Sequence, residues 1–402
     1  MKVQKSRVKA QGTEGISSFN KFFPYHFYFL SITFFLFPFT FSCNFPENVN
    51  LNIDSPSFTN LSEYHFFTGE IKNLNPNVKV LPYDLINPLF SDYAEKIRFV
   101  WMPENTSALY NDSNVFEFPL GTVLIKNFYF PNDFRKISST PHSSGEDSVL
   151  RSGEAKIIET RLLIKRKNGW DALAYIWNED QTDALLEVAG GEKKIIFIDK
   201  SGNKIDFDYS IPNKNQCKSC HTNKGQFQPI GPKAKNLNKI FSFKEGGENQ
   251  LAKWKEVGYL KGFPNTGNVP KLPKWNDSTT GTLEQRALAY LEANCAHCHS
   301  PEGPAATSGL FLSSIENNSS HLGICKSPVA AGKGTGGFLY DIVPGKPDES
   351  ILFYRIISTD PGVMMPELGR KLAHQEGVDL VRQWITSLKG NCFADIRNHA
   401  SP

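Results

Sequence analysis

The sequence predicts an α+β fold, in which a β-rich N-terminal domain is followed by a mainly α-helical C-terminal region. Runs rich in β-branched and aromatic residues recur between residues 71 and 211, separated by turn-forming residues. Beyond this tract, apolar residues recur at helical spacing instead, most clearly at 282–294 and 375–388. The chain has 402 residues, of which 40% are apolar and 21% charged, so it suffices for two or three globular domains.

Six runs of the β-rich domain are predicted as strands: 115–120, 122–130, 156–167, 172–177, 194–199 and 204–209. Gly202-Asn-Lys204 between the last two predicts a hairpin turn. Charged residues on these runs, such as Arg161 and Asp171, are interpreted as solvated strand edges rather than as a catalytic site.

The helix predicted at 282–294 leads directly into Cys295-Ala-His-Cys298-His299. Thr282, with Gln285 three residues later, is a capping-box signature for the start of this helix. The C-x-x-C-H pattern is typical of covalent haem c attachment. Its two thiols can each add to a haem vinyl group, and the histidine that follows becomes the proximal iron ligand.

The same pattern occurs upstream as Cys217-Lys-Ser-Cys220-His221. With 7 Cys and 9 His in the chain, chance predicts about 0.003 copies of such a pentapeptide. A zinc ribbon that used all four cysteines would need about 15–20 residues between the pairs, far fewer than lie between Cys220 and Cys295. We therefore predict two covalently bound haem c groups, with His221 and His299 as proximal ligands.

An axial methionine for the second haem is predicted in the pair Met364-Met365. Two of the four methionines fall here, between the second motif and the helix at 375–388, where a thioether ligand is needed. Met365, directly before Pro366, is the preferred ligand, and a core methionine is the alternative. The sixth ligand of the first haem stays open among His65, His142, His297, His321, His374, His399 and Met102.

The N-terminus has the pattern of a targeting segment. Basic residues precede an apolar run at 27–41 that is too short to span a bilayer comfortably. Ser42-Cys43 then ends the run in a way similar to a bacterial lipobox, so Cys43 is the predicted lipidation site, with an ordinary exported protein as the alternative. Export agrees with the haem motifs, because c-type haem is attached outside the inner membrane. We expect a cell-envelope protein of a Gram-negative-type bacterium, periplasmic or on the outer membrane and held there by a lipid anchor.

A disulfide is predicted between Cys325 and Cys392, the two cysteines that are left when those assigned to lipid and haem are set aside. Lipid at Cys43 and haem at the two motifs account for the other five cysteines. Two free thiols are unusual in an exported chain, which meets oxidising conditions, although buried reduced thiols remain the alternative.

Seven lysines lie between residues 209 and 244 without any acidic residue: Lys214, Lys218, Lys224, Lys233, Lys235, Lys239 and Lys244. They indicate either a docking face for an acidic redox partner in the periplasm or membrane, or a solvated surface. The net charge is only +3, and no basic patch with interleaved aromatic residues suggests nucleic acid.

The order helix, C-x-x-C-H, Met-Pro, helix resembles class I cytochrome c, and the whole chain is similar to a family of dihaem c-type cytochrome lipoproteins with an N-terminal β-domain. Three runs add to the second resemblance: Asn87–Ala94, Phe118–Thr122 and Gly231–Asn238. The implied organisation is a signal peptide at 1–43, a tether at 44–70, the β-rich domain at 71–211, a first haem segment at 212–280 and a class I-like cytochrome c domain at 281–402.

These features favour a dihaem protein that transfers single electrons. The alternative is an enzyme, a dihaem peroxidase or oxidase in which the first haem has an open position. A third interpretation makes the β-rich domain a binding module for a partner or a glycan. The fold alone does not separate these three interpretations, and the decisive feature is the sixth ligand of the first haem.

Overall fold

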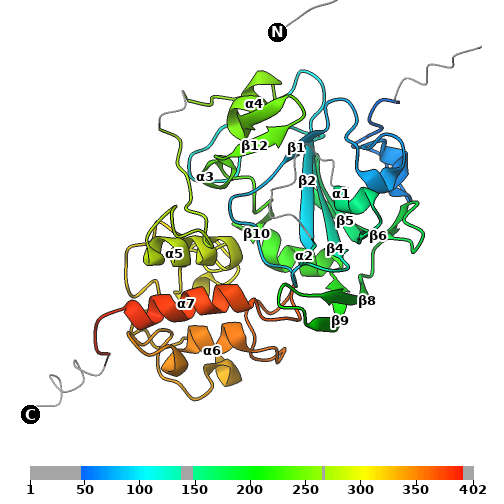
Figure 1. Ribbon diagram of the computed structural model, residues 1–402. Helices are drawn as coiled ribbons and strands as arrows, with labels where there is room; N and C mark the ends of the chain where they lie inside the picture. The colour runs from blue at the N-terminus through cyan, green and yellow to red at the C-terminus, as the bar shows by residue number, and fades with distance from the viewer. Residues whose placement is uncertain (1–46, 137–147, 265–267, 393–402) are drawn as a thin grey trace, which may run out of the picture. The chain divides into compact units, whose positions relative to one another are not determined.

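The computed structural model describes residues 47–136, 148–264 and 268–392 (Figure 1). The predicted signal peptide with Cys43 lies outside these residues, as do His142 and His399. Strands dominate the N-terminal half, and the longest helices lie in the C-terminal part, so the α+β class is confirmed. No helix in the described ranges is both long and apolar enough to cross a membrane.

The β-rich part is centred on a six-stranded sheet with the order β1-β2-β4-β5-β6-β7, in which all neighbouring strands are antiparallel. Because successive side chains of a strand point to opposite faces, the central strands contribute to two cores. Val123 and Ile125 pack into one core, and Leu124 packs into the other. The strands are β1 Leu81–Tyr83, β2 Glu95–Trp101, β4 Val123–Pro131, β5 Ala155–Arg166, β6 Gly169–Trp177 and β7 Ala184–Glu187.

The segment expected to be a tether is instead part of this fold where it is described. Residues 61–64 form the 3₁₀ helix η1, and Leu61, Tyr64 and Phe66 are almost fully buried in the core of the sheet. The hydroxyl of Tyr175 on β6 lies 3.0 Å from that of Tyr64. The expectation was wrong because the polar composition of this stretch hid the apolar side chains that pack on the sheet. A second 3₁₀ helix, η2, spans Ile71–Asn73.

The strand expected at 115–120 is also absent from the sheet. Its backbone forms only isolated bridges, from Glu117 to Leu109 and from Val115 to Lys233. The aromatic side chains Phe116 and Phe118 pack around Trp254 in a second core instead. Two short strands, β3 Ala108–Leu109 and β14 Leu260–Lys261, pair in parallel near this core.

The predicted hairpin is confirmed. β8 Gly191–Ile198 pairs in antiparallel register with β9 Lys204–Ile211, and the turn lies between them. Phe197 and Tyr209 pack with Phe130 of β4, so the hairpin covers part of the sheet. A single helical turn, α1 Ser148–Arg151, lies before β5.

The first C-x-x-C-H motif lies within a helix, α2 Lys214–His221. The segment that follows is built from short elements. They are β10 Thr222–Asn223, β11 Gln226–Phe227, α3 Ala234–Leu237, β12 Ile240–Phe243, β13 Gly246–Asn249 and α4 Gln250–Glu256. Of these elements, α3 and α4 pack into the second core.

Between residues 281 and 392, the structure describes three helices: α5 Leu283–Asn294, α6 Ile351–Ile357 and α7 Gln375–Ser387. The 3₁₀ turns of this part lie at Ala306–Ser308, Gly332–Thr335 and Pro347–Glu349. The predicted capping box is present: Thr282 accepts a hydrogen bond from the backbone of Gln285, whose side chain accepts one from the backbone of Thr282. α7 passes close to α5 at Gly377, where a Cβ atom would lie 2.3 Å from Tyr290.

A disulfide joins Cys325 to Cys392, the pair that subtraction of the other cysteines suggested. It links the loop that follows the second motif to the chain just after α7. The closed loop spans 67 residues and includes α6 and Met365.

We expect the double variant Cys325→Ser/Cys392→Ser to lower the free energy of unfolding by about 4 kcal/mol, because the unfolded chain then gains the entropy of an open loop. Urea unfolding of the variant and the wild type under non-reducing conditions measures this difference. Alkylation of both cysteines in native, unreduced protein would contradict the bond.

Candidate haem-binding site

The two C-x-x-C-H turns lie side by side, although the sequence separates them widely. One ligand atom each of Cys220, His297 and Cys298 lies within 4.8 Å of the other two. The backbone N–H of Lys224, just after the first motif, donates to the carbonyl of Glu302, just after the second, at 3.0 Å. The fold therefore brings both motifs into a single site.

The first motif is held by its helix. Asn213 caps α2 through a reciprocal pair of hydrogen bonds with Gln216, each 2.9 Å long. His221 ends the helix with its Nδ1 2.8 Å from the carbonyl oxygen of Gln228 and its ring stacked on Phe227. Burial lowers the pKa of His221 to about 3. A neutral ring whose Nδ1–H donates to a carbonyl has a free Nε2, which is the form that binds a metal.

The second motif follows the last turn of α5. Cys295 is the C-cap of that helix, and its carbonyl accepts hydrogen bonds from the N–H groups of Cys298 and His299. The Nδ1 of His299 lies 3.3 Å from the hydroxyl oxygen of Ser308. Burial lowers the pKa of His299 to about 4. Both motif histidines therefore have an oxygen atom beside Nδ1.

Each motif faces a cavity. The first cavity, of about 220 Å³, is lined by Cys217, Cys220 and His221, by the face of the sheet that carries Leu124, and by the loop at 85–91. The second, of about 640 Å³, is lined by the second motif together with apolar residues that include Leu310, Leu312 and Leu352. The second volume lies within the range of about 300–1,000 Å³ that is usual for cofactor and ligand sites, and the first is smaller than this range. Cys220, Cys295, His297 and Met365 line both cavities, so the two spaces adjoin.

Met365, the predicted axial ligand, lines the second cavity together with His299. Met364 is buried and is not among the residues that line either cavity. The buried guanidinium of Arg370 holds the loop, donating to the carbonyl oxygen of Met365 at 2.9 Å and to that of Ser358 at 2.9 Å. The Met365 N–H donates to the carbonyl of Arg355. The backbone of Met365 is therefore fixed on both sides.

Of the described candidates for the sixth ligand of the first haem, only His297 and His374 line the first cavity. Met102 is buried in the second core, and His65 and His321 contact Glu47 and Glu316 away from both cavities.

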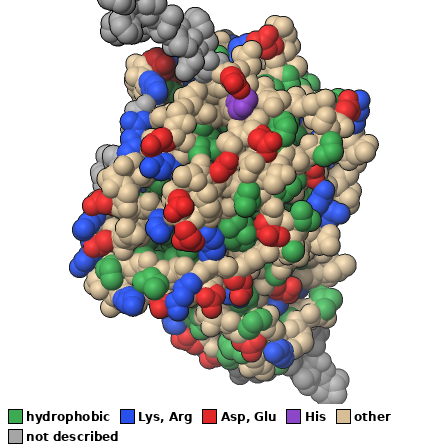
Figure 2. Space-filling view, turned by 90° about the vertical axis from the view of Figure 1, so that its right-hand side faces the viewer, with side chains coloured by type: hydrophobic (Ala, Val, Ile, Leu, Met, Phe, Trp, Pro, Cys, Tyr) green, Lys and Arg blue, Asp and Glu red, His purple; other side chains and the backbone are tan. Residues whose placement is uncertain are grey.

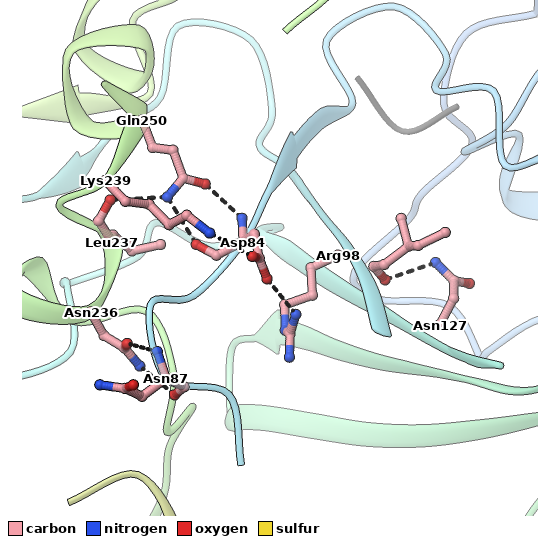
Figure 3. Close-up of polar contacts among 9 residues, drawn as sticks. Asp84, Asn87, Arg98, Asn127, Asn236, Leu237, Lys239 and Gln250 are labelled. Atoms are coloured by element: carbon pink, nitrogen blue, oxygen red, sulfur yellow. Dashed lines mark hydrogen bonds and ion pairs between the residues drawn. The ribbon is translucent and has the colours of Figure 1, made fainter. Parts of the chain in front are cut away.

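Most of the lysines considered for a docking face form ion pairs within the chain. Lys233 and Lys235 pair with Glu292, and Lys224 pairs with Glu302. Lys239 shares Asp84 with Arg98, as Figure 3 shows, and Lys214 pairs with Asp171. Figure 2 shows acidic and basic side chains interspersed on the face that it presents. The run of lysines in the sequence therefore does not correspond to one unbalanced surface.

The loop after β1 connects the sheet to both motif segments. Asn87 and Asn236 exchange hydrogen bonds of 2.8 Å and 3.1 Å (Figure 3). The N–H of Phe90 donates a hydrogen bond to the side chain of Asn294 at the end of α5. The carboxylate of Asp92 accepts a hydrogen bond from the N–H of Lys371, which lies in the loop between α6 and α7 that contains Met365, here named the methionine loop. The run at 87–94 thus fixes the position of the site relative to the sheet.

Sequence reasoning missed three cations of the sheet, Arg98, Lys126 and Arg161, which line the first cavity. Arg161 was interpreted as a solvated strand edge. It is partly buried instead and pairs with the fully buried Glu159 at 2.5 Å. Only the register of the strands, which single runs do not reveal, places these side chains together.

Comparison of the chain with protein-family models, with curated proteins and with solved structures found no match.

Glu292 of α5 joins the two motif segments, because Lys233 and Lys235 both contact its carboxylate, at 3.2 Å and 2.9 Å. Burial alone would raise the pKa of Glu292, but the two lysines outweigh it and lower the pKa to about 2. The ionised carboxylate of Glu292, with its two lysines, therefore stabilises the fold above the pKa of a glutamate in the unfolded chain, about 4.3. This stabilisation is lost as pH falls through about 2.

We expect Glu292→Gln to lower the free energy of unfolding by about 3 kcal/mol near pH 6, with the difference from wild type shrinking steadily between pH 5 and pH 2. Urea unfolding across this pH range measures it. The exposed Glu284 on the same helix provides a matched control, and Glu284→Gln should change the free energy by less than about 0.5 kcal/mol. A difference for Glu292→Gln that is independent of pH would contradict the assignment.

Proposed function

We propose that this chain is an exported c-type cytochrome that binds two haem groups covalently and passes single electrons between redox partners. The observation that carries the proposal is the pair of adjacent C-x-x-C-H turns. In each turn, the histidine has its Nδ1 next to an oxygen atom, so its Nε2 would be the nitrogen that binds iron. A bound haem supplies an iron that cycles between the ferric and ferrous states, which is one-electron chemistry.

The residues present fit these groups. Cys217, Cys220 and His221 would hold the first haem, and Cys295, Cys298 and His299 the second. Met365 would supply the remaining axial ligand of the second iron. The apolar residues Leu310, Leu312 and Leu352 would pack against such a group, and the apolar surroundings of a haem tune its redox potential.

We also propose the finer fold that the sequence suggested for residues 281–402, the arrangement of a class I cytochrome c. The order of α5, the C-x-x-C-H turn, the methionine loop and α7 supports it. The core in which Leu291, Phe353 and Trp384 pack together joins all three helices next to the second cavity. The resemblance to dihaem c-type cytochrome lipoproteins with an N-terminal β-domain rests on the same motifs.

Electron transfer is favoured over peroxidase or oxidase chemistry because two histidines line the first cavity, where an enzyme would need an open position. His297 is the better candidate for the sixth ligand. Its Nδ1 is buried and has no hydrogen-bond partner. Both ring nitrogens of His374 have polar neighbours, Tyr290 at 3.2 Å and Glu376 at 3.6 Å, and its ring stacks on Phe90.

The adjacency of the two motifs supports direct electron exchange. The sulfur atoms of Cys220 and Cys298, which would each carry a haem, are within 4.8 Å of one another. An electron that enters at one group therefore has a short route to the other. The partner is a redox protein of the periplasm or membrane, and lipid at Cys43 would anchor the chain in the cell envelope.

A second candidate function is a metal site, which one observation favours. Cys220, His297 and Cys298 offer three ligand atoms at distances that suit an ion such as Zn²⁺. A structural zinc site takes four protein ligands, and this cluster supplies three among the described residues. It also leaves the two motif histidines, His221 and His299, without a role.

Two haem groups should remain attached to the chain after denaturation and acid-acetone extraction, because thioether bonds survive both. Intact-mass spectrometry of the protein from a host with haem c maturation measures them. Variants in which both cysteines of one motif become serine should each lose one haem. A mass without haem, together with a stoichiometric metal ion, would favour the zinc site.

Met365→Ala should abolish the far-red charge-transfer band of methionine-ligated ferric haem, and Met365→His should lower the potential of one haem, since thioether ligation raises it. Absorption spectroscopy and a potentiometric titration measure these effects. Met364→Ala is the matched control and should keep the band. Loss of the band in Met364→Ala alone would transfer the ligand role to that residue.

A further inference from the structure

Three cations stand in direct register across the middle of the sheet. Arg98 of β2 pairs with Lys126 of β4, and Lys126 pairs with Arg161 of β5. Directly opposed residues on neighbouring antiparallel strands have Cβ atoms about 4.5–5.5 Å apart, and like charges at such positions destabilise a sheet. The three residues, which we name the cation row, therefore need negative charge nearby.

The chain supplies only part of that charge. Arg98 contacts Asp84 at 2.9 Å, but Asp84 also contacts Lys239 at 2.7 Å, so its charge is shared between two cations (Figure 3). Arg161 contacts Glu159 at 2.5 Å, and Glu159 also accepts a hydrogen bond from the hydroxyl of Tyr209. Each end of the cation row thus has one carboxylate, and the middle has none in contact.

Lys126 is the residue that the chain leaves unmatched. No hydrogen bond or ion pair joins its ammonium group to another described residue, and its Nζ lies 4.5 Å from the centroid of the Phe128 ring. A ring face offers a cation far less than a carboxylate does. A lysine placed between two arginines without an anion is an arrangement that a bound anion would stabilise.

The cation row lines the first cavity together with Cys217, Cys220 and His221. Glu292 is the only carboxylate among the described residues that line this cavity, and it already pairs with Lys233 and Lys235. The lining therefore has an excess of positive charge, and the cation row supplies three of its cations, beside Lys233, Lys235 and Arg370.

We propose that the cation row binds a carboxylate or oxyanion group within the first cavity. Two sources offer this chemistry. One is the pair of propionate groups of the first haem, and this source rests on the proposed function. The other is a small free oxyanion that enters the cavity. In both cases the arginines supply planar, paired donors and Lys126 supplies the point charge that completes the site.

Lys126→Met tests the site, because it removes the charge and keeps an unbranched side chain that is only one atom shorter. Lys126→Arg keeps the charge, and Lys156→Met is the control on the same sheet, where the side chain is 58% exposed and pairs with Glu179. Intact mass first establishes that each variant carries the same number of haem groups. Redox potentials are then measured, and sulfate, nitrite and sulfite are titrated into each protein by calorimetry and absorption.

If propionates fill the site, Lys126→Met lowers the redox potential of one haem. The lysine ammonium disfavours the more positive ferric form, and the variant removes this effect. Lys126→Arg and Lys156→Met keep the wild-type potential, and the added oxyanions do not bind. If a free oxyanion fills it, the wild type binds at least one of the three saturably, and Lys126→Met weakens that binding about tenfold or more.

The proposal is overturned if Lys126→Met carries the wild-type number of haem groups and changes neither a potential nor the binding of an oxyanion. Failure of the proposed function gives a different result. The intact mass of the wild type is then that of the chain without haem. Calorimetry with the oxyanions still decides whether the cation row binds an anion.

Discussion

The contact between the two C-x-x-C-H turns is the constraint on which the rest of the structure depends. Cys220 at the end of α2 meets His297 and Cys298 just beyond α5, within 4.8 Å. Buried charges and backbone hydrogen bonds hold the two segments in this position, through Glu292 with its two lysines and through the run at 87–94 that reaches both. A site assembled from such distant parts of the chain forms only when the whole fold has formed.

This constraint gives the β-rich part a role that its composition does not suggest. One face of the sheet buries a core with the segment at 49–67, and the other face forms a wall of the first cavity. The sheet is therefore a part of the proposed haem site. The first motif has no small helical fold of its own, because its cavity is lined by the sheet, α2 and the loop at 85–91 together with residues of α5 and of the loop that contains Met365.

Sequence patterns predicted the features that are local. The capping box at Thr282, the extent of α7, the hairpin at 202–204 and the two motifs all depend on neighbouring residues. The features that were missed depend on pairing between distant segments. The packing of Tyr64 on β6, the bridges that replace a strand at 115–120 and the ion pairs of the lysine run need the tertiary fold. The cation row is the clearest case, since its three residues lie on three different strands and meet only through register.

Electron paramagnetic resonance of the fully oxidised protein, combined with its absorption spectrum, tests the central claim most directly. The account predicts two low-spin ferric haems, because His221 and His299 each have a second ligand available, and it predicts magnetic interaction between them, because the turns that would carry them are in contact. Reduction of the haem of higher potential should then change the signal of the other. A spectrum with one high-spin haem would contradict the closed first site, and a spectrum without haem would contradict the proposed function.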